Sequence, residues 1–151
     1  MKSRSILSRK GFTLIEIIIV MGIFVIVIAF AVFISFDFYR SYAFRSERNI
    51  LVSVLQHARS KAISNINQCA HGVRFESDKY VIFEAADAGC PSPAPDEEIQ
   101  ANPTANVTTD FGDTVTFSRL SGNVSASGDI NLTSGPQTAT ISINNEGRIN
   151  W

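Results

Sequence analysis

Residues 10–16 read Lys-Gly-Phe-Thr-Leu-Ile-Glu, and this stretch joins a basic leader to an apolar run that reaches residue 34. Residues 17–34 carry no charge and approach the roughly 20 residues that span a bilayer. Glu16 stands at the start of this apolar segment, where a carboxylate is expensive in hydrocarbon. The stretch therefore predicts a membrane-length helix whose acid needs a specific partner.

Three interpretations of this segment compete. A plain single-pass membrane anchor accounts for the apolar run but gives Glu16 no role. A cleaved secretory signal fits poorly, because the run exceeds the roughly 7 to 15 residues of a signal core and no small-x-small cleavage site follows it. The third interpretation is a site at which a peptidase cuts the chain, and it also explains the order of the residues.

The run Gly-Phe-Thr-Leu-Ile-Glu at residues 11–16 resembles the processing site of the type IV prepilin superfamily, which includes type IV pilins and the pseudopilins of type II secretion. The resemblance implies that a membrane peptidase cuts after Gly11 and that the new terminal residue, Phe12, is methylated. Gly11 suits such a cut because a residue without a side chain enters a protease easily in extended form. The acidic fifth residue of the mature chain falls on Glu16.

In that family Glu16 would act in subunit assembly. Its carboxylate would lie near the depth of the Phe12 amino group of a neighbouring subunit, so that a charge pair forms when two helices are offset along a filament. Because an unpaired buried carboxylate costs several kcal/mol, this pair would fix the register of the subunits as well as attract them.

Composition limits the remaining possibilities. A chain of 151 residues, less a leader of 11, leaves room for one membrane helix and one small domain. The leader holds four of the thirteen bases and no acid, which leaves nine bases against fourteen acids, a formal charge of −5 before the new amine is counted. This balance argues against a general nucleic-acid binder, whose affinity rests on clustered Lys and Arg.

The bases ahead of the apolar run predict orientation. By the positive-inside rule they stay in the cytoplasm, so the chain is expected in the bacterial inner membrane as a single-pass protein with a periplasmic or extracytoplasmic C-terminal domain. Arg40, Arg45 and Arg48 on the far side weaken that argument.

Cys69 and Cys90 are the two cysteines, and both lie in the part expected to face an oxidising compartment, where disulfides persist. A bridge would close a loop of about 20 residues and add on the order of 3 kcal/mol in the chain-entropy model. Two unpaired thiols remain the alternative. No metal site is predicted, because neither a CxxC pair nor paired histidines accompany them, and no cofactor is expected.

Past the apolar run, residues 37–64 contain no Gly or Pro and keep a helical period, with one apolar face at Leu51, Leu55, Ala58 and Ala62. One continuous helix is expected from about residue 13 to about residue 65. The expected divisions are a leader at 1–11, a transmembrane or filament-core helix at 12–36, the amphipathic soluble half of the helix at 37–66 and a β-rich domain at 67–151.

After the helix the pattern changes to period 2. Residues 72–76 and 79–84 predict a hairpin, and a meander-like set of further strands is predicted at 114–118, 123–126, 129–132, 138–143 and 148–151. Residues 85–110 contain four prolines and predict a long irregular stretch, with a solvated acidic tip at residues 96–98. The fold class is α+β: a long N-terminal helix packed against a C-terminal antiparallel sheet domain, as in pilins.

Two shorter stretches narrow the family. The run Ala-Arg-Ser-x-Ala-Ile at residues 58–63 and the ending at residues 141–149 resemble the minor pseudopilin H of type II secretion and related type IV minor pilins, the GspH/FimT type. This resemblance implies a structural filament subunit of a type II pseudopilus or a type IV pilus. It also implies other pilin or pseudopilin subunits, a prepilin peptidase and methyltransferase, the inner-membrane assembly platform and membrane lipid as partners.

A DNA-binding minor pilin for uptake is the alternative function. Some DNA-uptake minor pilins of this group end in Gly-Arg-x-Arg, whose arginines grip phosphate, whereas residues 147–150 here read Gly-Arg-Ile-Asn. Arg148 is therefore a possible DNA contact, and a basic stripe around it would favour that function. An enzyme is not predicted: His57 shares a helix with Arg59 and Lys61, and no nucleophile motif surrounds it or His71.

Overall fold

A computed structural model describes residues 11–85, 90, 94–102 and 105–151, without the side chains of residues 33–37. The chain divides into two compact units, the first ending at Arg40 and the second running from Ser41 to Trp151. The helix α1 (Leu14–Ile63) begins in the first unit and ends in the second. The expected single helix is therefore confirmed, with its ends within two residues of the prediction.

In the first unit, residues 17–32 of α1 are all apolar or glycine. Its stretch Leu14–Val32 has 19 residues with a mean hydropathy of 3.1, and none of that stretch is buried within the structure. A helix that is hydrophobic all round needs either a membrane or a protein environment to cover it. By length and composition this stretch is sufficient to cross a bilayer.

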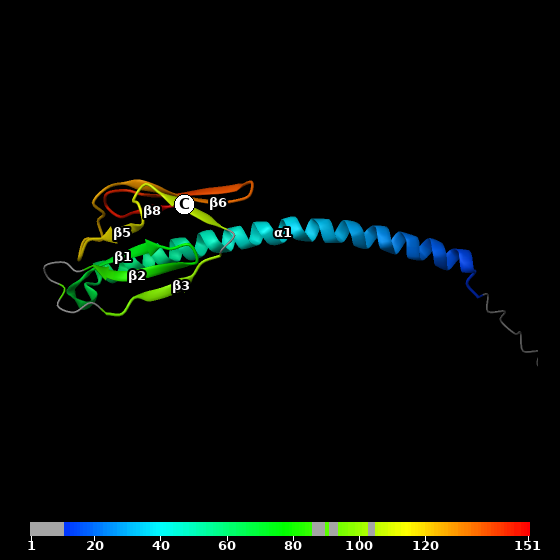
Figure 1. The fold of residues 1–151 in the computed structure, drawn as a ribbon, viewed down its shortest axis with the longest axis horizontal. Coiled ribbons are helices and arrows are strands. Elements are labelled where there is room, and N and C mark those ends of the chain that lie inside the picture. Colours follow the sequence, from blue (N-terminus) through cyan, green and yellow to red (C-terminus); the bar gives the residue numbers. More distant parts are fainter. Residues whose placement is uncertain (1–10, 86–89, 91–93, 103–104) are drawn as a thin grey trace, which may run out of the picture. The chain divides into compact units, whose positions relative to one another are not determined.

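The second unit holds the last part of α1 and two four-stranded antiparallel sheets beside it (Figure 1). A short 3-10 helix, η1 (Ile66–Gln68), follows α1. The first sheet has the order β3-β2-β1-β5 and consists of β1 (Ala70–Phe75), β2 (Lys79–Ala85), β3 (Glu97–Gln100) and β5 (Thr114–Phe117). The second has the order β4-β6-β7-β8 and consists of β4 (Asn106–Thr109), β6 (Gly128–Ser134), β7 (Gln137–Ile143) and β8 (Ile149–Asn150).

The core lies between α1 and both sheets. The predicted apolar face of α1 is confirmed, since Leu51, Leu55, Ala58 and Ala62 are completely buried. They belong to one cluster with side chains from both sheets, among them Val73, Tyr80, Val115, Phe117, Ile130, Ile141 and Ile143. Full burial of one such aliphatic side chain stabilises the fold by about 1.5–3 kcal/mol, so this face holds the helix to the sheets.

Glu47 is a charged residue inside this core, with 2% of its surface exposed. The Tyr80 hydroxyl donates a hydrogen bond to its Oε1 at 2.6 Å, and the Asn102 backbone N–H donates to its Oε2 at 3.0 Å. Burial, and then the hydrogen bond to Glu47, raise the pKa of Tyr80 far above its usual value. Glu47 thereby fastens α1 to β2 and to the chain after β3, because both carboxylate oxygens have donors.

The predicted hairpin is confirmed, with Val73 opposite Ile82 in the β1–β2 register. Three expectations are corrected. Residues 85–110 are not irregular throughout, because β3 and β4 lie within them. Residues 123–126 form no strand, since the Val124 N–H makes an isolated bond to the Asn145 carbonyl rather than joining a ladder. The later strands are divided between two sheets, because β5 pairs with β1.

Candidate functional site

The expected processing site lies just ahead of α1. Gly11 and Phe12 are outside the helix, both residues are exposed, and Phe12 is 81% exposed. A Cβ atom built on Gly11 would meet no described atom within 4 Å apart from those of its chain neighbours. The peptide bond between Gly11 and Phe12 is thus in accessible, non-helical backbone, which is the form in which a protease binds its substrate.

Thr13 caps the N-terminus of α1. Its Oγ1 accepts a hydrogen bond from the Glu16 N–H at 3.3 Å, and its carbonyl accepts one from the Ile17 N–H at 3.3 Å. A threonine at the cap followed by glutamate three residues later has the spacing of a capping box. Sequence reasoning missed this role, although the Thr-x-x-Glu spacing was enough to find it. The cap makes the helix begin at Leu14 and so keeps Gly11 and Phe12 outside it.

Glu16 lies in the first turn of α1, and its side chain is exposed between the exposed apolar side chains of Ile15 and Ile17. A carboxylate at this end of a helix is favoured by the macrodipole by about 0.3–1 kcal/mol. Within the part of the chain that the structure describes, the carboxylate has no hydrogen-bond or ion-pair partner. Glu16 is therefore available to a group from outside the described chain.

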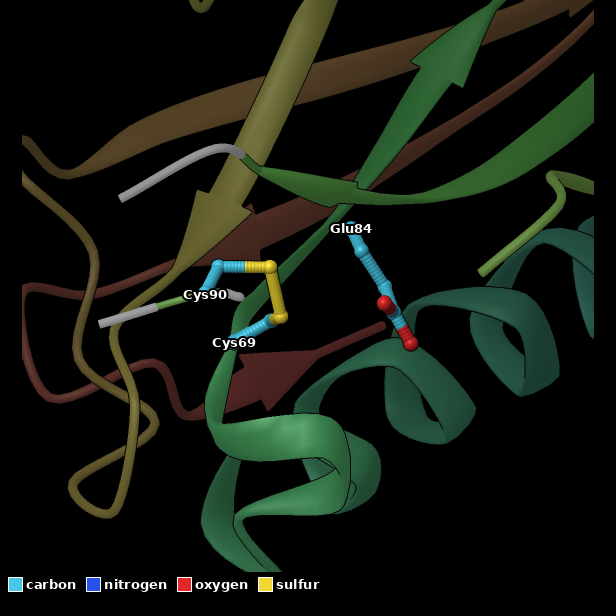
Figure 2. Close-up of side chains that lie close together, drawn as sticks. All are labelled: Cys69, Glu84 and Cys90. Carbon is cyan, nitrogen blue, oxygen red and sulfur yellow. A yellow bond between two sulfur atoms is a disulfide. The ribbon is translucent and has the colours of Figure 1, made fainter. Parts of the chain in front are cut away.

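The disulfide between Cys69 and Cys90 is confirmed. Cys69 is completely buried at the turn from α1 into β1. This turn contains three non-glycine residues in the left-handed region, Asn65, Asn67 and Gln68, with φ of 54°, 53° and 58°. Asparagine tolerates that region better than most residues, which explains two of the three. The disulfide links this turn to the segment that follows β2 (Figure 2).

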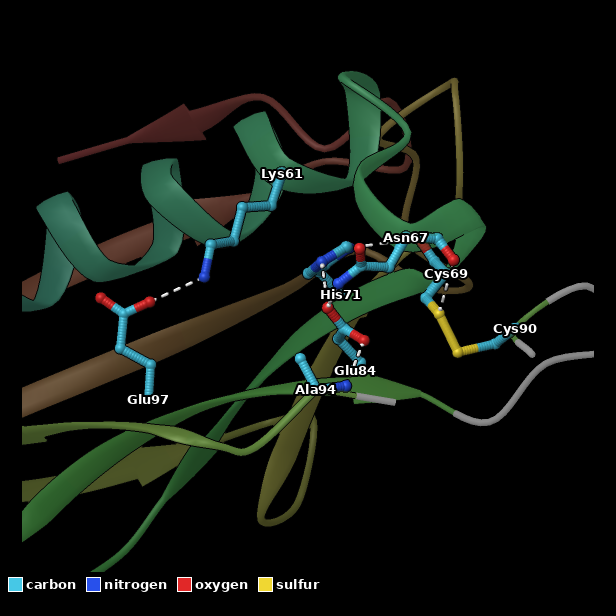
Figure 3. Close-up of polar contacts among 8 residues, drawn as sticks. All are labelled: Lys61, Asn67, Cys69, His71, Glu84, Cys90, Ala94 and Glu97. Carbon is cyan, nitrogen blue, oxygen red and sulfur yellow. Dashed lines mark hydrogen bonds and ion pairs between the residues drawn. A yellow bond between two sulfur atoms is a disulfide. The ribbon is translucent and has the colours of Figure 1, made fainter. Parts of the chain in front are cut away.

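Glu84, near the end of β2, lies beside the disulfide (Figure 2). One of its carboxylate oxygens and the two sulfur atoms all lie within 4.8 Å of one another. The Ala94 N–H donates to Glu84 Oε2 at 2.7 Å, and the Asn67 amide donates to Oε1 at 2.7 Å (Figure 3). Burial, the largest single influence, raises the pKa of Glu84, but these two hydrogen bonds and the nearby His71 together bring it below its usual value.

His71 on β1 is the other polar group of this cluster, and it is 1% exposed. Its Nδ1 lies 3.1 Å from the Cys69 carbonyl oxygen, and because a carbonyl can only accept, Nδ1 carries the hydrogen. Its Nε2 lies 3.4 Å from Glu84 Oε1, within ion-pair range, but its geometry makes no hydrogen bond. A proton on Nε2 completes an ion pair with this carboxylate, and a bound cation would satisfy the same two groups.

The acidic tip at residues 96–98 is exposed, as expected, and each of its acids also has a basic partner. The three ion pairs are Asp96 with Arg74 at 2.9 Å, Glu97 with Lys61 at 2.7 Å and Glu98 with Lys79 at 2.8 Å. Glu97 also lies 3.8 Å from Nδ1 of His57, which lines an open groove of about 750 Å³ along α1. Exposed pairs of this kind are each worth about 0–1 kcal/mol, so they fix β3 only weakly.

Arg148 is exposed and lines a cleft of about 470 Å³ together with Arg59 and Trp151. The Arg59 Nη2 already donates to the Glu146 carbonyl at 3.1 Å. Two arginines, one of them bound to the backbone, are far fewer than the clustered bases that nucleic-acid affinity requires. The cleft therefore gives little support to the DNA-uptake alternative.

Comparison with protein families decides between the interpretations. Residues 6–32 match the prokaryotic N-terminal methylation motif, and residues 47–147 match the family described as type II transport protein GspH. The chain belongs to the GspH family. Searches among curated proteins and among solved structures found no match. As a GspH protein it is a minor pseudopilin of type II secretion, a structural and non-enzymatic subunit that carries the methylation motif of prepilins.

The two matches fall in different units of the GspH chain. The methylation motif lies in the first unit and the GspH match lies in the second. The methylation motif contains Gly11, Phe12, Glu16 and the apolar stretch Leu14–Val32, which together fit a prepilin of the inner membrane. The GspH match begins at the buried Glu47 and includes the strands from β1 to β7. Membership of the GspH family implies other pseudopilus subunits as partners and processing by a prepilin peptidase.

Proposed function

We propose that a prepilin peptidase cuts this GspH-family chain between Gly11 and Phe12 and that the new terminus at Phe12 is methylated. The observation that carries the proposal is the match of the methylation motif to a peptide that is exposed and non-helical. The Thr13 cap supports it, because it holds the helix to a start at Leu14 and leaves the bond to be cut in backbone that a protease can bind.

The mature subunit then waits in the inner membrane, with its N-terminus at the cytoplasmic side and the second unit in the periplasm. The bases of the leader support this orientation by the positive-inside rule. The Cys69–Cys90 disulfide supports it independently, because disulfides persist in an oxidising compartment. From there the inner-membrane assembly platform moves the subunit into a type II pseudopilus.

Glu16 directs that assembly by pairing with the Phe12 amine of a neighbouring subunit. In the described chain the carboxylate has no partner and lies among exposed apolar side chains. A charged side chain within a bilayer costs up to about 2.5–3.5 kcal/mol on insertion scales, and a partner of opposite charge offsets part of that cost. The pair forms in one axial offset of two helices, so it selects the register of the filament.

Cleavage is tested by co-expressing the chain with a prepilin peptidase and measuring the mass of its N-terminal peptide. Gly11→Val should leave the leader attached, because the new side chain obstructs entry into the protease. Gly22→Val is the matched control, since Gly22 also has open space around its Cβ position but lies within α1. Full processing of Gly11→Val, or a wild-type chain that keeps residues 1–11, would refute the proposed cut.

Assembly is tested with Glu16→Gln, which keeps the side-chain size and removes its charge. The variant should be cleaved normally but should enter filaments at a small fraction of the wild-type level, as measured in sheared pseudopili. Glu98→Gln provides the control, because it removes an exposed acid of β3. Equal incorporation of Glu16→Gln and Glu98→Gln would refute the charge pair while leaving the cut at Gly11 intact.

A further inference from the structure

Three metal-ligating side chains meet at the turn between α1 and β1, and a fourth lies beside one of them, although their spacing in the sequence gave no sign of it. Cys69 precedes β1, His71 is on β1, Glu84 is near the end of β2 and Cys90 follows β2. The two sulfur atoms and a Glu84 oxygen lie within 4.8 Å of one another. His71 extends the cluster, because its Nε2 is 3.4 Å from Glu84 Oε1.

His71 can supply this cluster with a further ligand atom, its Nε2. The Nδ1 hydrogen is engaged by the Cys69 carbonyl at 3.1 Å, so Nε2 is the nitrogen left to take up a proton or a metal ion. That atom is buried without a hydrogen-bond partner among the described residues, and it faces the Glu84 carboxylate. A metal-bound histidine has this arrangement, with one nitrogen on the metal and the other fixed by a backbone carbonyl.

We propose that the reduced form of this chain binds a zinc-class divalent cation through Cys69, Cys90, Glu84 and His71. Two thiolates, one imidazole nitrogen and one carboxylate oxygen are the ligand types that zinc prefers in a tetrahedral site. They come from the turn before β1, from β1, from β2 and from the segment after β2, so the site exists only in the folded second unit. The site requires reduction of the disulfide, and it is independent of the proposed cleavage at Gly11.

In the test, a phosphine reduces the disulfide. The phosphine gives two electrons to the S–S bond and takes up oxygen from water as phosphine oxide, and the two protons of that water end on the two sulfurs. Binding of the cation then releases both thiol protons. In the oxidised chain neither sulfur carries a thiolate, so the disulfide and the metal exclude one another.

Glu84 is already arranged as a ligand. Its carboxylate is held by the Ala94 N–H and the Asn67 amide, each at 2.7 Å (Figure 3). These donors orient the oxygen atoms beside the sulfurs, as outer-shell partners orient the ligands of known metal sites. The disulfide and this hydrogen-bonded acid therefore anchor the same turn by two different means.

The test uses the full chain in detergent micelles, reduced with a phosphine under argon and titrated with Co²⁺ as a spectroscopic probe for zinc. The reduced wild type should bind one equivalent, with a thiolate-to-cobalt charge-transfer band and tetrahedral d–d bands that Zn²⁺ abolishes. The oxidised chain should show neither band. Cys69→Ser and Cys90→Ser should each weaken or abolish the charge-transfer band.

Glu84→Gln is the decisive variant, because it replaces the anionic carboxylate ligand by a neutral amide and leaves the thiols unchanged. Its cobalt affinity should fall at least about tenfold. Removing a group that only hydrogen-bonds to a metal ligand already lowers the affinity by about that much, and a change in the ligand itself should cost no less. Glu97→Gln is the matched control, an acid of β3 paired with Lys61 (Figure 3), and its affinity should equal that of the wild type. Both variants are first shown by near-ultraviolet circular dichroism to be folded in the oxidised state.

Several outcomes would overturn the proposal. One is the absence of cobalt bands in the reduced wild type, whether or not its native circular dichroism survives reduction. Another is an equal affinity in Glu84→Gln and Glu97→Gln. A third is a cobalt spectrum that persists unchanged when denaturant unfolds the second unit, which would show that two thiols bind the metal without the folded site.

Discussion

Replacing Tyr80 by phenylalanine tests whether the buried Glu47 fastens α1 to the sheets. Tyr80 is 1% exposed, and its hydroxyl donates to Glu47 Oε1 at 2.6 Å, at the short end of O–H···O distances. The substitution keeps the ring and removes this donor. Glu47 Oε2 retains the Asn102 N–H at 3.0 Å, whereas Oε1 loses the Tyr80 donor inside the core.

The expected cost follows from that geometry. Hydrogen bonds to charged groups contribute about 1.5–3 kcal/mol, and a buried acceptor left unsatisfied costs a similar amount, so Tyr80→Phe should lower the free energy of unfolding by about 2 kcal/mol. Glu47→Gln should also destabilise, because an amide offers one acceptor atom where the carboxylate offers two. In the double variant the two costs should fall short of additivity, since both residues belong to one interaction.

The assay is denaturant unfolding of the oxidised chain in detergent, followed by near-ultraviolet circular dichroism and by the fluorescence of Trp151, the single tryptophan. Tyr42→Phe is the matched control, because Tyr42 is 67% exposed and its loss should stay within about 0.5 kcal/mol. If Tyr80→Phe shifts the midpoint no more than Tyr42→Phe at an unchanged denaturant slope, the reasoning about Glu47 is refuted.

Three further predictions concern pH and packing. The pKa of Tyr80 is raised in the folded chain above the 10.0 of a free tyrosine, so the unfolded state loses this proton first. The free energy of unfolding should therefore be constant below about pH 10 and fall above it. In an alkaline titration of unfolding, Tyr80→Phe should not show this loss. The pKa of Glu84 is lowered below 4.5 in the folded chain. Its contribution to the free energy of unfolding should therefore be complete above about pH 4.5 and disappear as the pH falls through the pKa of the folded state. If the loss of stability at acidic pH is the same in Glu84→Gln as in the wild type, this prediction is contradicted. Gly72→Ala should lower the free energy of unfolding by about 1–3 kcal/mol or more. The new Cβ would lie 2.5 Å from the Phe83 ring and 2.7 Å from the Val115 carbonyl oxygen. A shift in the unfolding midpoint equivalent to less than about 0.5 kcal/mol would contradict this prediction.

Local periodicity was sufficient to predict α1 and the β1–β2 hairpin. The apolar face of α1 repeats over many residues, and the hairpin has alternating residues on both sides of a short turn, so neighbours in sequence decide both elements. The strands β3 and β4 were missed because each has four residues among prolines and is set by a partner far away in the chain. Residues 123–126 had a strand-like pattern without such a partner.

The residues of the candidate site also fall into two groups, those that could be predicted from the sequence and those that could not. Gly11, Phe12 and Glu16 lie within six consecutive residues, so their arrangement was readable in the sequence, and so was the Thr13 cap that was overlooked. The cluster around Glu84 was not readable, because Asn67, His71 and Ala94 reach it only after the chain has turned and paired. Glu47 was missed for the same reason, since its donors come from β2 and from the chain after β3.

In the described part of the chain, the edges of both sheets are short. The outer strands β3, β4 and β5 have four residues each and β8 has two, whereas the inner strands have six or seven. A short edge exposes few unpaired backbone groups and is a poor template for another chain. Copies of this subunit can therefore accumulate side by side before they polymerise, without sticking together through their sheets into aggregates.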